Sequence, residues 1–378
     1  RYETRDVIRK RGELSSCPVL FGSATPSVQL FSEVEKGDLP CFCLHNRAVE
    51  GSTLPKMQVV DMRKELEEGN RSIFSRVLEG KIQERLDRGE QVMLFMNRRG
   101  YAPFVSCRKC GEALRCPHCD VSLNLHKNGI LQCHYCGYQT NLPKICPNCK
   151  SKYLAAFGTG TEKLESICHS IFPKAGILRM DRDSTGKKGK YEEILQAFSE
   201  EKADILLGTQ MIVKGHDFPK VTLVGIIAVD QILLDSDFQA GEWAYQLITQ
   251  VSGRAGRGER AGEVLIQSYQ PDHPLLELAL KQDYLSFYKE EKNYRKRLSY
   301  PPFSVMLAMQ CIYTEEAYLD YILGKLMPRV QERIRDGGGE TYGPFPATVY
   351  KIKDKFRKII YIKHSNHDII LQLRDYFI

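Results

Sequence analysis

Eight of the thirteen cysteines in this 378-residue chain lie between residues 107 and 149, where they form four C-x-x-C pairs. Thiolates are preferred ligands of zinc, and the turn of one C-x-x-C pair offers two corners of the zinc tetrahedron. Two pairs close one structural site, so the segment predicts two sites. Because every ligand position is a cysteine, no coordination position stays open for a catalytic water, and we expect both zinc ions to be structural.

The spacing of the pairs favours a nested arrangement. Thirteen residues separate the two inner pairs, which is the length of a hairpin, and the two outer pairs flank them. We expect the outer site to be formed by Cys107, Cys110, Cys146 and Cys149. We expect the inner site to be formed by Cys116, Cys119, Cys133 and Cys136. Sequential pairing also fits the spacing, and an iron–sulfur cluster is the weaker alternative for the same thiolates.

Positive charge is concentrated around the same cysteines. The chain carries a net charge of +7, and residues 97–152 contain nine basic and two acidic side chains. A local basic excess suggests a polyanionic partner, usually a nucleic acid, although a solvated charged surface gives the same count. Clustered C-x-x-C pairs in a chain that opens without a secretory signal indicate metal binding in a reducing compartment, so we expect a cytoplasmic protein.

The composition excludes two classes of protein. Hydrophobic residues make up 42% of the chain and charged residues 27%, which is ordinary for a globular protein and excludes disorder as the main state. No run approaches the ~18 uninterrupted apolar residues of a membrane-spanning helix, so we expect no membrane partner. The first residue is Arg and not Met, and we expect the sequence to be a piece of a longer protein.

Outside the cysteine segment, strand and helix patterns alternate, which is typical of a parallel α/β sheet. Short apolar runs predict its strands at Met57–Met62, Gln91–Met96, Tyr153–Phe157, Gly176–Met180, Ile205–Leu207, Val221–Val229 and Glu263–Tyr269. The spacing of apolar residues predicts helices over Ile73–Glu90 and Thr161–Phe172. We therefore expect one α/β domain over 40–100 and 153–270, interrupted by a zinc-binding insert over 101–152.

The last hundred residues have a different character. A charged helix is predicted over Asp283–Arg297, and two alternating runs, Val349–Lys353 and Phe356–Lys363, predict a hairpin. We expect a separate α+β domain over 271–378 that binds DNA or partner proteins. The basic side chains of the hairpin are either a DNA surface or a solvated strand face. They are Lys351, Lys353, Arg357 and Lys358.

Three short stretches carry residue patterns of energy-coupling motors. The first, Gly22–Ser27, follows the apolar stretch Pro18–Phe21, which is predicted to be a strand. The second combines Gly208–Met211 with Gly215–Pro219. The third is Gln250–Arg257, which reads Q-V-S-G-R-A-G-R.

The third stretch places two arginines three residues apart. On a helix, Arg254 and Arg257 would face the same way, and such a pair can stabilise charge on a γ-phosphate during phosphoryl transfer. The alternative is a basic helix end that pairs with Glu259 and Glu263. The two companion stretches favour the phosphate interpretation.

In this order on an α/β scaffold, the three stretches resemble motifs III, V and VI of superfamily 2 helicases. A closer resemblance is to the PriA family of replication-restart helicases, also called primosomal protein N′. It is carried by Leu94–Pro103, which runs into the eight cysteines, and by Gly158–Glu162, Arg179–Asp183 and Gly343–Ala347. The resemblance covers essentially the whole chain. It implies a RecA-like second helicase lobe with a two-zinc insert, followed by a C-terminal α+β domain that helps to grip DNA.

The resemblance also implies roles for single residues. It implies that Arg254 and Arg257 act at the γ-phosphate and that Gln250 is a catalytic residue that helps to form the same face of the cleft. It implies that Gly215 and Asp217 bind the nucleotide. It implies that hydrolysis is coupled to lobe closure by Ser23, Ala24 and Thr25. It implies that the DNA backbone is contacted by Asn97, Arg98, Thr209 and Gln210.

For the whole protein, the resemblance implies a 3′→5′ DNA helicase driven by ATP and Mg²⁺, which recognises forked DNA and initiates primosome assembly. The implied partners are forked and single-stranded DNA, single-stranded DNA-binding protein and other primosome proteins, in the bacterial cytoplasm at the nucleoid. Two alternatives remain open. One is a zinc-ribbon DNA-binding module without motor activity, and the other is a primosome scaffold.

The chain departs from the family in one respect. It contains no G-x-x-x-x-G-K-[ST] phosphate loop and no D-E-x-H magnesium motif, and in the family both precede the position that matches Arg1. We therefore expect the chain to be the C-terminal half, with residues 1–39 as the tail of the first lobe. Without the phosphate loop, we expect this chain alone not to hydrolyse ATP at a useful rate.

Overall fold

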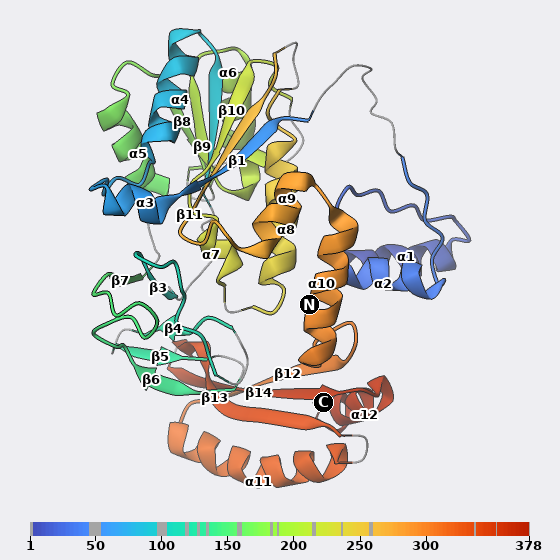
Figure 1. The fold of residues 1–378 in the computed structure, drawn as a ribbon. Helices are drawn as coiled ribbons and strands as arrows, with labels where there is room; N and C mark the ends of the chain where they lie inside the picture. The colour runs from blue at the N-terminus through green and yellow to red at the C-terminus, as the bar shows by residue number, and fades with distance from the viewer. Residues whose placement is uncertain are drawn as a thin grey trace.

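The computed structural model shows two large sheets, with the cysteine segment lying between them (Figure 1). The residues described are 3–44, 54–96, 104–117, 121–126, 129–133, 136–156, 161–181, 184–186, 189–213, 217–235, 237–256, 260–335, 338–352 and 354–377. Within them, the chain forms a six-stranded sheet, two small sheets in the cysteine segment and a three-stranded C-terminal sheet.

The six-stranded sheet is parallel throughout, with the strand order β1-β11-β10-β2-β9-β8. Its strands are β1 (Lys56–Asp61), β2 (Gln91–Phe95), β8 (Ile177–Met180), β9 (Ile205–Gly208), β10 (Val221–Ile226) and β11 (Glu263–Ser268). Every residue of β2, β9 and β10 is buried, as expected for central strands of a sheet that is covered on both faces. The predicted α/β class is confirmed.

Helices cover both faces of this sheet because successive strand residues point to opposite sides. Leu94 packs with α4 (Arg76–Asp87) and α5 (Thr161–Ile171). Phe95 belongs to the cluster on the other face, which includes α6 (Lys190–Ser199), α8 (Ala240–Ser252) and α9 (Pro274–Lys281). Two short helices, α3 (Met62–Glu67) and α7 (Asp230–Leu233), follow the ends of β1 and β10.

The cysteine segment begins and ends with two short strands that pair with each other in antiparallel fashion. These are β3 (Val105–Cys107) and β7 (Leu154–Ala156). Between them lies a second small sheet of β4 (Asn124–Leu125), β5 (Ile130–Gln132) and β6 (Gln139–Asn141). The strand predicted at Tyr153–Phe157 therefore exists, but our placement of it in the large sheet was wrong. An inserted segment whose two ends lie together pairs those ends with each other.

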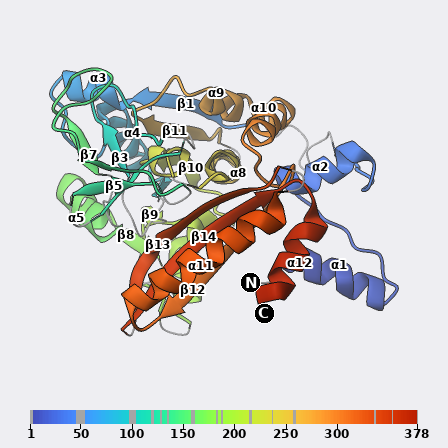
Figure 2. The ribbon, with the colours of Figure 1, turned by 90° about the horizontal axis from the view of Figure 1, so that it is seen from below.

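The C-terminal part is an antiparallel sheet with helices on one face (Figure 2). After α10 (Tyr284–Arg297), the sheet has the order β12-β14-β13, formed by β12 (Val305–Tyr313), β13 (Glu340–Ile352) and β14 (Lys355–His364). The predicted hairpin is present, although β13 begins nine residues earlier than the alternation indicated. Helices α11 (Glu316–Ile334) and α12 (His367–Phe377) pack on the face that carries Ile360 and Ile362. No helix in the described stretches has both the length and the apolar character to cross a membrane.

The N-terminal residues form two helices, α1 (Thr4–Leu14) and α2 (Val28–Lys36). The strand predicted at Pro18–Phe21 is not formed, and Leu20 is 90% exposed. An extended segment becomes a strand only where a second strand accepts its backbone hydrogen bonds. None of the described residues pairs with 18–21 in this way.

Core packing between α6 and the large sheet gives a testable prediction. Phe198 is fully buried, with its ring centroid 4.9 Å from that of Phe218. Phe198→Ala should lower the free energy of unfolding by about 3–5 kcal/mol, because it leaves a cavity in a close-packed core. The measurement is urea unfolding followed by circular dichroism. Leu285→Ala is the control, since that side chain is 65% exposed and its loss should cost less than about 0.5 kcal/mol. Equal losses would contradict the packing described.

Candidate functional site

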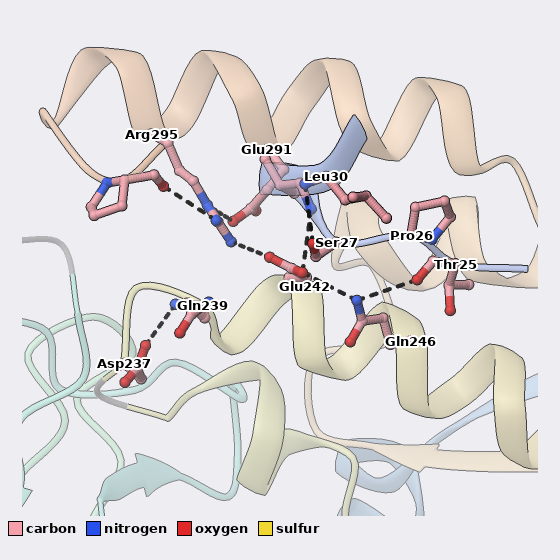
Figure 3. A network of polar contacts seen from close by, with 12 residues as sticks. Thr25, Pro26, Ser27, Leu30, Asp237, Gln239, Glu242, Gln246, Glu291 and Arg295 are labelled. Carbon is pink, nitrogen blue, oxygen red and sulfur yellow. Dashed lines mark hydrogen bonds and ion pairs between the residues drawn. The ribbon is translucent and has the colours of Figure 1, made fainter. Parts of the chain in front are cut away.

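The first motor-like stretch lies in a groove against α8. The groove has a volume of about 680 Å³ and is lined by residues of 20–30, by α8 and by the end of α10. The Nε2 atom of Gln246 donates a hydrogen bond to the carbonyl oxygen of Thr25 at 3.4 Å (Figure 3). The hydroxyl of Tyr284 donates to the carbonyl oxygen of Pro26 at 3.0 Å. Side chains of two helices therefore hold this extended stretch in place.

The three predicted coupling residues lie in this stretch. Thr25 is buried, whereas Ser23 and Ala24 are exposed. The hydroxyl of Ser23 accepts a hydrogen bond from the Thr25 amide at 3.0 Å. Ser27 then caps α2, because its hydroxyl accepts from the Leu30 amide at 3.2 Å. The stretch is thus a turn that leads into a helix, with its polar side chains at the groove.

A buried ion network fixes the wall of the groove. Arg295 on α10 is only 2% exposed, and it donates hydrogen bonds to Glu242 on α8 at 2.7 Å and to Glu291 at 2.8 Å (Figure 3). The other carboxylate oxygen of Glu242 accepts from the amide of Val28 at 3.3 Å. Burial raises the pKa of Glu291. One guanidinium therefore joins α8, α10 and, through Glu242, the start of α2.

Sequence analysis did not identify this network. A weak signal was present, because Glu242 belongs to the same helical face as apolar residues such as Tyr245, which is fully buried. A charged residue at a buried helical position requires a partner. That partner lies 53 positions away in the chain, and no sequence pattern indicates it.

The predicted γ-phosphate residues lie at the end of α8. Gln250 is on α8 and lines the groove. The helix ends at Ser252, so Arg254 lies in the turn after it and not on a helix with Arg257. Gly253 at the C-cap explains this end, because glycine has the poorest helix propensity after proline.

Arg254 meets the second motor-like stretch. Its Nη1 atom lies 3.6 Å from Oδ1 of Asp217, whose side chain is 64% exposed. Two residues predicted from separate stretches are thus brought together. Glu263, the alternative partner of the arginine pair, instead contacts Arg85 at 2.8 Å. Three further residues of this argument lie outside the described residues, namely Gly215, Arg257 and Glu259.

The predicted DNA contacts of the large sheet follow two of its strands in the chain, after the carboxyl end of each. Thr209 follows β9, and Gln210 begins the short 3-10 helix η1 (Gln210–Val213). Asn97 and Arg98 follow β2, the neighbour of β9, but they lie outside the described residues. In parallel sheets, ligands bind at this edge. The assignment of these four residues to DNA stays a prediction.

The basic side chains of the C-terminal hairpin are largely paired. Lys351 lies 3.1 Å from Asp354, and Arg357 donates to Gln310 at 2.7 Å. Lys358 is buried and contacts Asp320 and Glu316, which fits a paired strand face better than a DNA surface. Lys353 lies outside the described residues. Lys351 and Arg357 remain candidates for a DNA contact.

Four cysteines of the expected outer site come together. The sulfurs of Cys107, Cys110, Cys146 and Cys149 all lie within 4.8 Å of one another. The sulfurs of Cys107 and Cys149 are 3.5 Å apart, and those of Cys110 and Cys146 are 3.7 Å apart. These thiols come from the first and the last C-x-x-C pairs, so the nested arrangement is the one that the fold supports.

A second cluster contains three cysteines of the expected inner site. The sulfurs of Cys116, Cys133 and Cys136 lie within 4.8 Å of one another, with Cys116 and Cys136 3.2 Å apart. Cys119 lies outside the described residues. Each cluster thus has the sulfur-only composition of a structural zinc site, with both buried and half-buried thiols.

The thiol chemistry fits a bound divalent cation. Among the described residues, each cluster presents only sulfur atoms, and thiolates are preferred ligands of zinc. A zinc ion would hold the sulfurs of each cluster as thiolates, and in the outer cluster it would cross-link the two ends of the segment. These clusters therefore suit a structural metal, in which no ligand position is left for chemistry.

Three known families match successive parts of the chain. The PriA DNA helicase Cys-rich region domain matches residues 116–140. The helicase conserved C-terminal domain matches residues 150–259, and the primosomal protein N C-terminal domain matches residues 296–376.

Curated relatives match nearly the full chain. Replication restart protein PriA of Bacillus subtilis (strain 168) is 43% identical over 97% of this chain and 45% of its own length. The PriA proteins of Synechocystis and Haemophilus influenzae are 40% and 36% identical, over 97% and 100% of this chain and 45% and 51% of their own lengths. The chain thus spans about half the length of these relatives.

The buried ion network yields a prediction about stability. Arg295→Ala should lower the free energy of unfolding by about 3–5 kcal/mol, because it leaves Glu242 buried without its partner. The measurement is chemical denaturation of the purified chain. Lys281→Ala is the matched control, since it breaks an exposed pair with Glu277 four residues away, and such pairs contribute little to stability. A loss for Arg295→Ala as small as the control's would show that the network contributes little.

The cysteine clusters predict the metal content. The purified chain should contain two zinc ions, and Cys133→Ser should lower the content to about one, because it removes a ligand of the inner cluster only. Elemental analysis by plasma mass spectrometry measures this. Cys311→Ser, which changes a cysteine outside both clusters, should leave two ions bound. Retention of two ions in Cys133→Ser would exclude the inner site.

Proposed function

Since the chain corresponds to the C-terminal half of the PriA replication restart proteins, we propose that it completes the nucleotide cleft of an ATP-dependent DNA helicase. The observation that carries the proposal is the contact of Arg254 with Asp217. It joins residues from two motor-like stretches at the carboxyl end of α8. The groove that holds Gly22–Ser27 lies along the same helix.

In this proposal, the residues that respond to nucleotide gather around the carboxyl end of α8. Arg254 supplies positive charge to the γ-phosphate, where phosphoryl transfer develops negative charge. Its exposed neighbour Asp217 keeps the guanidinium in place until phosphate oxygens compete for it. Gln250 completes the same face, with Arg257 and Gly215 as further nucleotide contacts. Ser23, Ala24 and Thr25 couple this face to lobe closure.

The remaining chemistry of hydrolysis comes from outside this sequence. The chain contains neither a phosphate-binding loop nor a D-E-x-H motif, and the phosphate-loop amides and lysine are what cradle a nucleotide triphosphate. We therefore propose that ATP and Mg²⁺ bind only when this half is joined to a half that carries those motifs. Alone, the chain does not hydrolyse ATP at a useful rate.

DNA is the polymer on which this motor acts. The basic excess of residues 97–152 and the placement of Thr209 and Gln210 at the carboxyl edge of the sheet support backbone contacts. Such contacts suit a helicase that ignores sequence. In this proposal the protein translocates 3′→5′, recognises forked DNA and initiates primosome assembly with single-stranded DNA-binding protein and other primosome proteins. It acts in the bacterial cytoplasm, at the nucleoid.

A zinc-ribbon DNA-binding module or a primosome scaffold is the second candidate function. The two cysteine clusters favour it, because they need no nucleotide. The Q-x-x-G-R-x-G-R stretch separates the candidates, since a module that only binds DNA has no use for this pair of arginines.

The test is ATP hydrolysis by this chain joined to its N-terminal half, with forked DNA present. Arg254→Ala and Arg254→Lys should each lower kcat by about 1,000-fold, because they remove the planar guanidinium from the γ-phosphate. Affinity for forked DNA, measured by fluorescence anisotropy, should stay unchanged. Arg88→Ala is the control, since Arg88 is an exposed arginine in a surface pair with Glu84, and it should keep full activity.

Two results would decide against parts of this proposal. If both Arg254 variants still hydrolyse ATP, Arg254 does not act on the nucleotide in the cleft. A joined protein that binds forks but never hydrolyses ATP would favour the binding module.

A further inference from the structure

The described cysteine turns share one backbone geometry. In each, the amide of the residue after the second cysteine donates to the carbonyl oxygen of the first cysteine, and that residue has a positive φ. The three residues are Gly111 (2.8 Å, φ 75°), Gly137 (2.9 Å, φ 73°) and Lys150 (3.0 Å, φ 58°). Since a lysine occupies this position in one turn, the backbone conformation alone does not demand glycine.

What distinguishes the two glycines is their neighbours. A Cβ atom at Gly137 would lie 1.9 Å from Cε1 of Phe345, and a Cβ at Gly111 would lie 1.7 Å from the carbonyl oxygen of Tyr269. Lys150, by contrast, is exposed. Glycine therefore stands where a cysteine turn presses against another part of the chain. Tyr269 follows β11 of the large sheet, and Phe345 belongs to β13 of the C-terminal sheet.

A β-bulge directs Phe345 towards the cysteine segment. Tyr342 pairs with Tyr361, but Phe345 pairs with Ile359, so β13 has one extra residue between these pairs. Paired residues share a face, so Phe345 lies on the same face as Tyr342 and Tyr361. The opposite face carries Ile360, which is buried against α11 and α12. Without the extra residue, Phe345 would point towards those helices.

A shared hydrophobic cluster supports the same contact. It contains Leu131 and Cys133 from the cysteine segment together with Phe238, which precedes α8. It also contains Tyr300, at the entry to the C-terminal sheet, and Met306 of β12 packs against it. The cysteine segment therefore contributes to a core that the other two parts also need.

We propose that Phe345 is a positioning residue, which seats the inner cysteine turn on the C-terminal sheet. With Gly111 seated on Tyr269, the two metal clusters hold the insert between the large sheet and the C-terminal sheet. Metal occupancy of the inner cluster and the placement of β13 are then linked. Linkage is reciprocal, so disturbing the Phe345 contact loosens the metal, and removing the metal loosens β13.

The first experiment measures zinc release from the purified two-zinc chain to the chromophoric chelator 4-(2-pyridylazo)resorcinol. Gly137→Asn places a side chain where Phe345 lies, and asparagine tolerates a positive φ. Gly129→Asn is the matched control, because Gly129 lies in the same segment with φ 77° and a Cβ there would meet nothing within 4 Å. Both variants change one glycine to the same residue in similar backbone.

Gly137→Asn should accelerate release of one of the two zinc ions by about tenfold, and Gly129→Asn by less than about twofold. Phe345→Ala should also accelerate release, because the seat is lost. The double variant Gly137→Asn/Phe345→Ala should release zinc more slowly than Gly137→Asn, since the three nearest atoms to the added Cβ all belong to Phe345. Equal rates for the two asparagine variants, or an unchanged rate in Phe345→Ala, would overturn the proposal.

The second experiment tests the reverse direction on the unaltered chain. Removal of zinc should speed amide hydrogen exchange in β13 and β14, and exchange in β2 and β10 should stay slow. Unchanged exchange in β13 would overturn the proposal. Neither measurement uses ATP or DNA, so a failure here leaves the proposed motor function standing, and an inactive motor leaves this inference standing.

Discussion

The contact between Arg295 and Glu242 is the interaction on which the relative placement of the other parts depends. Both side chains are almost fully buried, so removing either would strand a charge in a medium of low dielectric constant. Glu242 lies on α8, which ends at Ser252 just before Arg254, and it also accepts a hydrogen bond from the amide of Val28. Arg295 lies on the helix that leads into the C-terminal sheet. A change in the angle between these two helices would separate the paired charges and cost free energy. Because both side chains also line the groove, the same contact fixes the shape of the groove.

Much of the large sheet was predictable because its signals are local. Strands β2 and β10 are apolar runs that are buried on both faces, and both begin at the predicted residue, although β10 ends at Ile226, three residues before the predicted end. Predicted helix boundaries were less accurate where a capping residue decides the first residue of the helix. The helix predicted from Ile73 begins at Arg76, because the Ser75 hydroxyl accepts a hydrogen bond from the Leu78 amide. The prediction of a strand at Pro18–Phe21 was wrong, because a strand forms only where a second strand pairs with it, and the sequence of the segment does not specify that second strand.

The candidate site was also predictable only where neighbouring residues in the sequence encode it. The four C-x-x-C turns could be predicted because spacing alone encodes the turn that presents each pair of sulfurs, whereas the spacing left sequential pairing open and the fold supports the nested arrangement. Arg254 and Asp217 come from two separate motor-like stretches, and their contact was not predicted. The predicted helix through Arg254 ends before it, at Ser252. The partners Glu242 and Arg295, and likewise Gly137 and Phe345, come from distant positions. Only the folded chain shows why a charge or a glycine occupies those places.

The antiparallel pair β3 and β7 makes the cysteine segment an excursion whose two ends lie side by side (Figure 1). Adjacent strands are ~5 Å apart. The two points at which the segment begins and ends are therefore close together, whatever the length of the chain between them. The entropy of closing such a loop grows slowly with its length. The length of the segment can therefore change without changing the strand order of the parallel sheet, provided that its two ends still pair and that it keeps the residues of the shared core, such as Leu131.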